Sequence, residues 1–186
     1  AKGVEPQTRK LFKVCALRHI PIFTFINKMD RETRDPLELC EEVERELGID
    51  TYAVNWPIGC GKEFQGVYDR EKGRILFFQA EERGKKVRSA EVALEDPALE
   101  DMVGEARAAA LREEVELLGA GREFDLEAVR NGTLSPVFFG SALTTFGVEP
   151  FLEEFLRMTT PPLSRVSDQG EVDAFSEDFS AFVFKI

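Results

Sequence analysis

The sequence predicts an α/β fold in which helices wrap a parallel sheet, with an α+β subdomain inserted between its strands. Strand-like and helix-like segments alternate over residues 6–48 and again over residues 134–162. Between these regions, short β-prone runs separated by glycines replace the helical periodicity. The alternation is typical of parallel strands joined by helices, and its interruption indicates an insertion.

Composition limits the classes of protein to which this chain can belong. Its 186 residues are 43% hydrophobic and 32% charged, as in globular proteins with a core. The chain has no membrane-length apolar stretch and no hydrophobic signal at its start, so we expect a cytoplasmic protein. The net charge of -11 argues against a broad basic face for nucleic acid. Cys15, Cys40 and Cys60 are too few and too widely spaced for a zinc knuckle or a disulfide framework.

The first predicted helix covers residues 6–19. Pro6 is tolerated in its first turn, and Leu11 and Phe12 belong to one apolar face. A short β-rich run, Ile22–Ile26, follows this helix. Because nearly all of that run is apolar, it indicates a strand covered on both faces.

The helix that comes next has clear boundaries. Asp35 can cap it, Pro36 fits the first helical position, and Glu38 can complete a capping box. Gly48 can end it. We therefore predict a helix between Asp35 and Gly48.

The rest of the chain divides into shorter elements. The β-prone runs of the insert are Val67–Tyr68, Arg74–Phe78 and Val87–Val92. After the insert, the pattern predicts a helix from Asp96–Pro97 to Leu118, a short helix over Leu126–Arg130, a buried strand over Pro136–Phe139, and a helix around Phe151–Leu156.

Polar loops follow the two buried strands, and ligands of parallel sheets bind beyond the carboxyl ends of strands. The first loop is Asn27–Asp30. Guanine offers a pair of donors, which the Asp30 carboxylate can accept together, and an acceptor edge that the Asn27 amide can meet. The Lys28 stem can lie along the ring plane. Asn27, Lys28 and Asp30 therefore predict a guanine site.

The second loop, Gly140–Ala142, completes this prediction. A backbone N–H near Ala142 could donate to guanine O6, and Ser141 could brace the Asp30 carboxylate. A bare Asn-Lys-x-Asp run also occurs as a simple surface turn. The position of both loops directly after β-rich runs favours the guanine site.

Gly59–Lys62 has a superficial likeness to a phosphate-binding loop. Such a loop needs a glycine five residues before the Gly-Lys pair and Ser or Thr after it. Here Trp56 and Glu63 occupy those positions. We interpret the run as a tight glycine turn within the insert.

Four runs of the sequence resemble the peptide chain release factor three family of bacterial translational GTPases. They are residues 25–31 (FINKMDR), 55–62 (NWPIGCGK), 64–69 (FQGVYD) and 136–142 (PVFFGSA). The resemblance extends over essentially the whole chain. The run containing Trp56 favours this family over elongation factor G, and an elongation-factor-G-like translocation GTPase is the alternative.

The resemblance implies a ribosome-dependent GTPase that promotes recycling of decoding release factors in translation termination. Its nucleotides are GTP and GDP, its metal is Mg²⁺, and its partners are the ribosome and the decoding release factors. The matching guanine-binding residues are Asn27, Lys28, Asp30, Ser141 and Ala142. The phosphate loop, the switch segments and the water-orienting histidine would precede Ala1, so we expect no catalytic residue, no Mg²⁺ ligand and no GTP hydrolysis in this chain alone. A different interpretation is a protein-interaction module with inert nucleotide loops.

The expected organisation is that of a fragment of a longer protein. Residues 1–50 and 134–163 would form the back part of an incomplete P-loop-type GTPase domain, around an inserted subdomain at 51–133. A linker at 164–178 would lead to residues 179–186, the first strand of a β-barrel domain. Because strands beside Ile22–Ile26 would be encoded upstream, we also expect an exposed sheet edge through which the chain self-associates.

Overall fold

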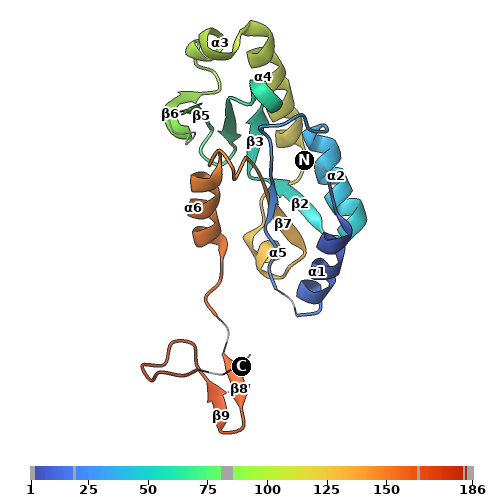
Figure 1. Cartoon of the computed structure of the whole chain (residues 1–186), viewed down its shortest axis with the longest axis vertical. Coiled ribbons are helices and arrows are strands. Elements are labelled where there is room, and N and C mark those ends of the chain that lie inside the picture. The colour runs from blue at the N-terminus through green and yellow to red at the C-terminus, as the bar shows by residue number, and fades with distance from the viewer. Residues whose placement is uncertain (1–2, 19, 81–85, 163, 182, 184–186) are drawn as a thin grey trace.

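The computed structural model describes residues 3–18, 20–80, 86–162, 164–181 and 183, and the side chains of 79–89 are not described. A parallel sheet lies at the centre of one half of the molecule (Figure 1). It contains β1 (Thr24–Ile26), β7 (Leu134–Phe139) and β2 (Asp50–Ala53), in the order β1-β7-β2. This sheet confirms the α/β fold and the two strands expected from the sequence, although only β7 is buried throughout and β1 is shorter than the predicted Ile22–Ile26.

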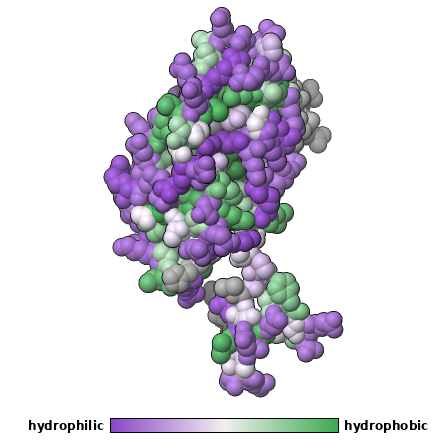
Figure 2. Space-filling view, turned by 180° about the vertical axis from the view of Figure 1, so that it is seen from behind, coloured by the Kyte–Doolittle hydropathy of each residue, from purple (hydrophilic) through white to green (hydrophobic). Residues whose placement is uncertain are grey.

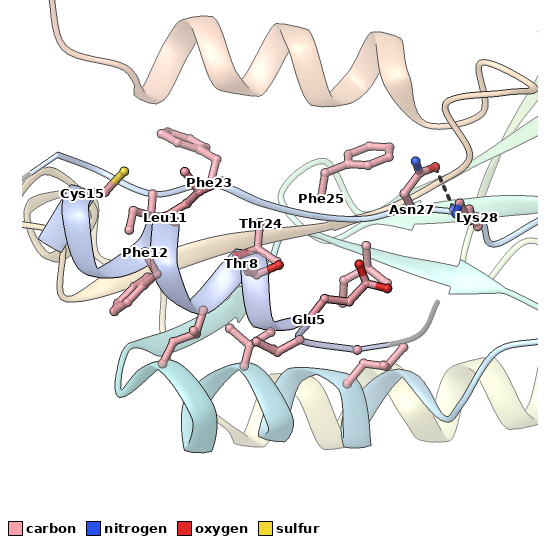
Figure 3. Close-up of a pocket in the computed structure, with 17 residues that line it drawn as sticks. Glu5, Thr8, Leu11, Phe12, Cys15, Phe23, Thr24, Phe25, Asn27 and Lys28 are labelled. Atoms are coloured by element: carbon pink, nitrogen blue, oxygen red, sulfur yellow. Dashed lines mark hydrogen bonds between the residues drawn. The ribbon is translucent and has the colours of Figure 1, made fainter.

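Helices cover both faces of the parallel sheet. The helices α5 (Leu126–Arg130) and α6 (Val148–Met158) lie on one face, and α1 (Pro6–Ala16) and α2 (Pro36–Leu47) lie on the other (Figure 1). Phe23 and Phe25 project toward α6, where they pack edge-on against Phe155 and Phe151 (Figure 3). The sheet is therefore the middle layer of three.

The boundaries of α2 follow the predicted chemistry. The Asp35 carboxylate accepts hydrogen bonds from the backbone N–H groups of Leu37 and Glu38, at 2.8 and 3.3 Å. Gly48 ends the helix with a φ of 68°, a left-handed conformation that glycine adopts without steric cost. Capping at both ends fixes where the chain leaves the first loop and where β2 begins.

A second, antiparallel sheet follows β2. Its strands are β3 (Asn55–Ile58), β4 (Gly66–Asp69), β5 (Arg74–Ala80) and β6 (Lys86–Ala93), paired in chain order, with a 3-10 turn, η1 (Gly61–Glu63), after β3. The predicted β-prone runs fall in β4, β5 and β6. The strand β3 was not anticipated, because Pro57 weakens a strand pattern, and β3 tolerates it as the edge strand of this sheet.

The long helix predicted from Asp96–Pro97 to Leu118 is two helices, and this prediction was wrong. They are α3 (Ala98–Val103) and α4 (Glu105–Ala120). Gly104 separates them with a φ of 85°, which no right-handed helix accommodates. The second helix also continues past the predicted end at Leu118, so Gly119 lies inside α4.

Two strands alter the predicted boundaries near residue 50. The four residues of β2 pair in parallel with β7, with Ala53 opposite Val137. The parallel sheet therefore continues to Ala53, and the division expected at residue 50 falls inside a strand.

The first helix is shorter than predicted. It ends at Ala16, not at residue 19, and Leu11 on its expected apolar face is 57% exposed.

The C-terminal segment stands apart from the rest of the molecule (Figures 1 and 2). Within the expected linker, β8 (Arg165–Ser167) and β9 (Gly170–Val172) form a short antiparallel hairpin. In the run expected to begin a barrel, the described residues 179–181 and 183 belong to no strand, and the other residues of that run lie outside the described part. Phe179 is 95% exposed.

Candidate functional site

The two loops singled out in the sequence lie side by side, because β1 and β7 are adjacent and parallel. The Gly140 N–H donates to the carbonyl of Ile26 at 3.1 Å, and the Met29 N–H donates to the carbonyl of Gly140 at 3.1 Å. The fold thus brings together, at the C-terminal ends of two neighbouring strands, segments that are more than a hundred residues apart in the sequence.

The side chain of Asn27 joins the loops. Its Oδ1 accepts from the backbone N–H of Lys28 at 2.7 Å (Figure 3). It also accepts from the backbone N–H of Ala142 at 2.9 Å. Because both partners are donors, the amide oxygen must face them. Asn27 is exposed, and its Nδ2 amide group is left to donate outward.

The rest of the first loop is a tight turn. Lys28 is exposed and has a φ of 71°, and its carbonyl accepts from the N–H of Arg31 at 3.1 Å. Met29 is fully buried and anchors the turn in the core. Asp30 is half-buried, and its Oδ1 is buried without a hydrogen-bond partner among the described residues. An acceptor without a donor is costly, so this carboxylate is suited to a ligand that supplies N–H groups.

The second loop is closed upon itself. Ser141 is fully buried and its N–H donates to the carbonyl of Phe146 at 2.9 Å. The Ser141 hydroxyl, expected to brace Asp30, accepts from the N–H of Thr144 at 3.4 Å. The Ala142 N–H, expected to face the base, is donated to Asn27. Both residues therefore hold the loops in place in this structure.

Phe146 anchors the second loop in the antiparallel half of the molecule. Its ring is fully buried and stacks on Phe78, with ring centroids 4.4 Å apart, and meets Phe64 edge-on at 5.4 Å. Sequence reasoning did not single out this residue, which belongs to neither predicted strand nor predicted helix. An isolated aromatic residue a few positions after a strand-end loop was the available signal.

The glycine turn after β3 braces the first loop through backbone hydrogen bonds. The Gly61 N–H donates to the carbonyl of Met29 at 2.8 Å and to the carbonyl of Arg31 at 3.1 Å. Gly59 and Gly61 have φ values of 77° and 61°, so the run that superficially resembles a phosphate loop is a tight turn, as expected. Its contact with the first loop was not foreseen.

An ion pair secures the exit of the first loop. The buried Glu42 carboxylate accepts from the Val4 N–H at 2.7 Å and from the Arg34 guanidinium. The Val4 hydrogen bond, followed by that of Arg34, holds the pKa of Glu42 below its ordinary value, and the Glu42 contact raises the pKa of Arg34.

On the same helix, burial raises the pKa of the Cys40 thiol to about 12, so this thiol stays protonated at neutral pH.

A groove of about 550 Å³ runs beside β1, between this strand and the helices α1 and α2. It reaches Asn27 and Lys28 at one end, and Thr24 projects toward its α1 side (Figure 3). Because β1 is an edge strand, the groove lies along an unpaired sheet edge. The first loop therefore opens onto a concave surface.

Neither a metal cluster nor a membrane helix occurs in the described part of the chain. No group of three or more His, Cys, Asp or Glu side chains among the described residues could hold a metal ion, so we assign none of them to Mg²⁺. None of the described helices has the length and apolar character needed to cross a membrane.

Comparison with known proteins reveals a matching family and a set of similar proteins. The model of the elongation factor Tu GTP binding domain matches residues 1–161. Proteins named peptide chain release factor 3 from Acaryochloris marina and Trichormus variabilis are each 53% identical over 188 residues, covering 100% of this chain and 35% of each relative. A similar protein of that name from Synechocystis is 52% identical, again with 35% of its length covered. The chain spans about a third of the length of these relatives.

A solved structure of a protein from Thermus thermophilus has a similar fold. It is 22% identical, with a TM-score of 0.56, and the match covers 91% of this chain and 29% of that one. At this identity, the likeness concerns the fold alone.

Proposed function

The chain belongs to the elongation factor Tu GTP-binding domain family, and from this premise we propose that it recognises guanine through Asn27, Lys28 and Asp30. The observation that carries the proposal is the hydrogen bond between Asn27 Oδ1 and the Ala142 N–H, 2.9 Å long. This bond couples the two strand-end loops and turns the Asn27 amine outward. Asp30 supplies an acceptor that lacks a donor among the described residues.

Each residue has a separate role in this proposal. The Asp30 carboxylate accepts hydrogen bonds from the ring N–H and the exocyclic amine of guanine. The Asn27 amide NH2 donates a hydrogen bond to the acceptor edge of the base. The Lys28 stem covers the ring. Ser141 and Ala142 hold the second loop, and Ala142 orients Asn27. A charge-assisted contact of this kind is worth roughly 1.5–3 kcal/mol, which favours guanine over adenine about 10- to 100-fold.

The longer protein to which such a chain belongs is proposed to be a ribosome-dependent GTPase that recycles decoding release factors in the cytoplasm. The support is the 53% identity, over the whole chain, to proteins named peptide chain release factor 3. Its ligands would be GTP and GDP, with Mg²⁺ bound by residues other than those described here. An elongation-factor-G-like translocation GTPase is the alternative.

The 186-residue chain is expected to bind the base without hydrolysing GTP. Phosphoryl transfer needs a phosphate cradle, a magnesium site and a positioned water, and no Gly-x₄-Gly-Lys-Ser/Thr run occurs in this sequence. We also propose that the chain between β2 and β7 contains an insert in the GTPase domain, which begins after Ala53, and that residues 179–186 begin a further domain.

Self-association through β1 is a further expectation. The strand is at the edge of its sheet, so the backbone groups on its outer side can pair with another strand. Sedimentation over a range of protein concentrations tests this. A monomer at every concentration would contradict it.

Nucleoside titrations test the guanine site. We expect the backbone amide signals of Asn27–Asp30 and Gly140–Ala142 to shift with guanosine at millimolar concentration, and much less with adenosine. The single tryptophan, Trp56, packs edge-on against Phe139 with ring centroids 5.3 Å apart, so its fluorescence offers a second readout. Equal responses to both nucleosides would refute guanine recognition and favour a protein-interaction module.

A further inference from the structure

The side chain of Asn55 takes the place of a neighbouring backbone strand beside β7, at the point where the chain leaves the parallel sheet. The residue is 3% exposed. The amide donates from Nδ2 to the carbonyl of Phe139 at 3.2 Å and accepts at Oδ1 from the N–H of Phe139 at 2.7 Å. A neighbouring strand would offer the same donor and acceptor to a residue of β7.

The strand β7 needs this substitute because its neighbour ends early. Pairing between β2 and β7 stops at Ala53 and Val137, and the Val54 N–H adds one bond to the Val137 carbonyl at 2.9 Å. The chain then turns into β3. Without Asn55, the N–H and carbonyl of the fully buried Phe139 would lose the partner that the described residues give them on this side.

Phe139 is directly connected to both loops of the proposed guanine site. Gly140 follows it and accepts from the Met29 N–H at 3.1 Å. Two residues further on, the Ala142 N–H orients Asn27. A shift of Phe139 would therefore move the bond between the loops.

The other end of the same segment contacts the first loop. Gly61, six residues after Asn55, donates to the carbonyls of Met29 and Arg31 at 2.8 and 3.1 Å. The segment from Asn55 to Gly61 thus contains β3, the edge of the antiparallel sheet, and holds one loop at each end.

From these contacts we infer that Asn55 is a positioning residue for guanine recognition, which couples the antiparallel sheet to the two base-reading loops. This inference rests on the proposed function. Any partner that shifts β3 would change guanine affinity, and guanine binding would change the affinity for that partner by the same factor.

Two buried polar residues near β7 provide a matched test. Asn55→Ala removes the bonds at the loop end of the strand. Ser135→Ala removes a buried hydroxyl near the opposite end, where it bonds to Ile22 and Thr24 at 2.9 and 2.8 Å. At a temperature where both variants are folded, we expect guanosine to bind roughly tenfold more weakly to Asn55→Ala and within about twofold of wild type to Ser135→Ala.

Amide hydrogen exchange separates failure of this inference from failure of the proposed function. In Asn55→Ala, the Met29 and Ala142 amides should exchange faster without any nucleotide, whereas Ser135→Ala should leave them unchanged. If wild type does not prefer guanosine, the proposed function fails and the exchange rates still decide the coupling. If both variants match in affinity and in exchange, the inference is overturned.

A wild-type measurement covers the case in which Asn55→Ala does not fold. Exchange in low denaturant then reports which amides open together. We expect Phe139 and Ala142 to open with the same free energy as Trp56 and Ile58 of β3. Opening of Ala142 independently of β3 would overturn the inference.

Discussion

The two loops of the candidate site follow neighbouring strands but are held in different ways. The second loop leaves β7, a central strand whose six residues are all buried, and Phe146 anchors it. The first loop leaves β1, a three-residue edge strand. Its position depends on bonds from Gly140, Ala142 and Gly61.

This difference separates rigidity from chemistry. The side chains proposed to contact guanine are all on the first loop, which follows the shorter, edge strand. The second loop is packed into the core and orients Asn27 without contacting the base itself. Changes in the second loop should therefore cost mainly stability, and changes in the first should cost mainly base preference.

The largest expected effect is on stability, from the second loop. Phe146→Ala removes a fully buried ring packed on Phe64 and Phe78, and should lower the free energy of unfolding by about 3–5 kcal/mol. Denaturant unfolding measures this. Phe151→Ala, on the α6 side of the sheet, is the control for losing a packed ring without touching either loop. A loss under about 1 kcal/mol for Phe146→Ala would mean that this loop is not anchored by its core contact.

The next effect concerns base preference and arises in the first loop. Asp30→Asn replaces an acceptor by an amide that can also donate, so preference should move from guanosine toward xanthosine, with a loss for guanosine of roughly 10- to 100-fold. Competition between the two nucleosides, followed by amide shifts, measures it.

Asp35→Asn is the matched control for Asp30→Asn. It makes the same chemical change five residues later, at a helix cap where Asn serves nearly as well as Asp. Thermal unfolding checks that both variants are folded. Unchanged guanosine preference in folded Asp30→Asn would remove this carboxylate from base recognition.

Local patterns in the sequence predicted much of this fold. Asp35 and Gly48 fix α2 through chemistry within one helix. The apolar runs of β1 and β7 identified the parallel sheet, and hence the strand ends at which the two loops meet. By contrast, nothing in the sequence indicated that the helix breaks at Gly104. A glycine inside a helical pattern can remain helical, and only the three-dimensional structure reveals its positive φ.

The supports of the candidate site were beyond sequence reasoning for a physical reason. Asn55 acts through Phe139, 84 residues away, and Gly61 acts through backbone carbonyls that have no sequence signature. The family resemblance identified the run that contains both, but not what the run contacts. Contacts between the backbone and a distant side chain depend on the assembled sheet.

A smaller effect isolates the support of the first loop by Gly61. Gly61→Ala and Gly73→Ala introduce the same side chain at the same φ of 61°, so each should cost about 1–2 kcal/mol of stability. At Gly61 the added carbon lies 2.7 Å from the Glu32 carboxylate, which must shift, beside the first loop that Gly61 braces, whereas nothing lies within 4 Å of the added carbon at Gly73. Only Gly61→Ala should weaken guanosine binding, as measured by titration. Equal affinities in the two variants would show that the first loop keeps its position without this brace.

The smallest effect is a pH dependence at the exit of the first loop. Glu42 has a folded-state pKa below its ordinary value of 4.5 because it accepts from Val4 and Arg34. Its stabilisation is therefore present above about pH 4.5 and is lost as the pH falls through the folded-state pKa. Glu42→Gln should flatten the decline of unfolding free energy on the acid side, measured by denaturant titrations from neutral pH down through the acid range. Arg34→Gln, which removes one of the two bonds, should give an intermediate slope. If Glu42→Gln keeps the wild-type dependence of unfolding free energy on pH, the first loop is held without this carboxylate. The first loop would then have even less support than its contacts indicate, compared with the second loop.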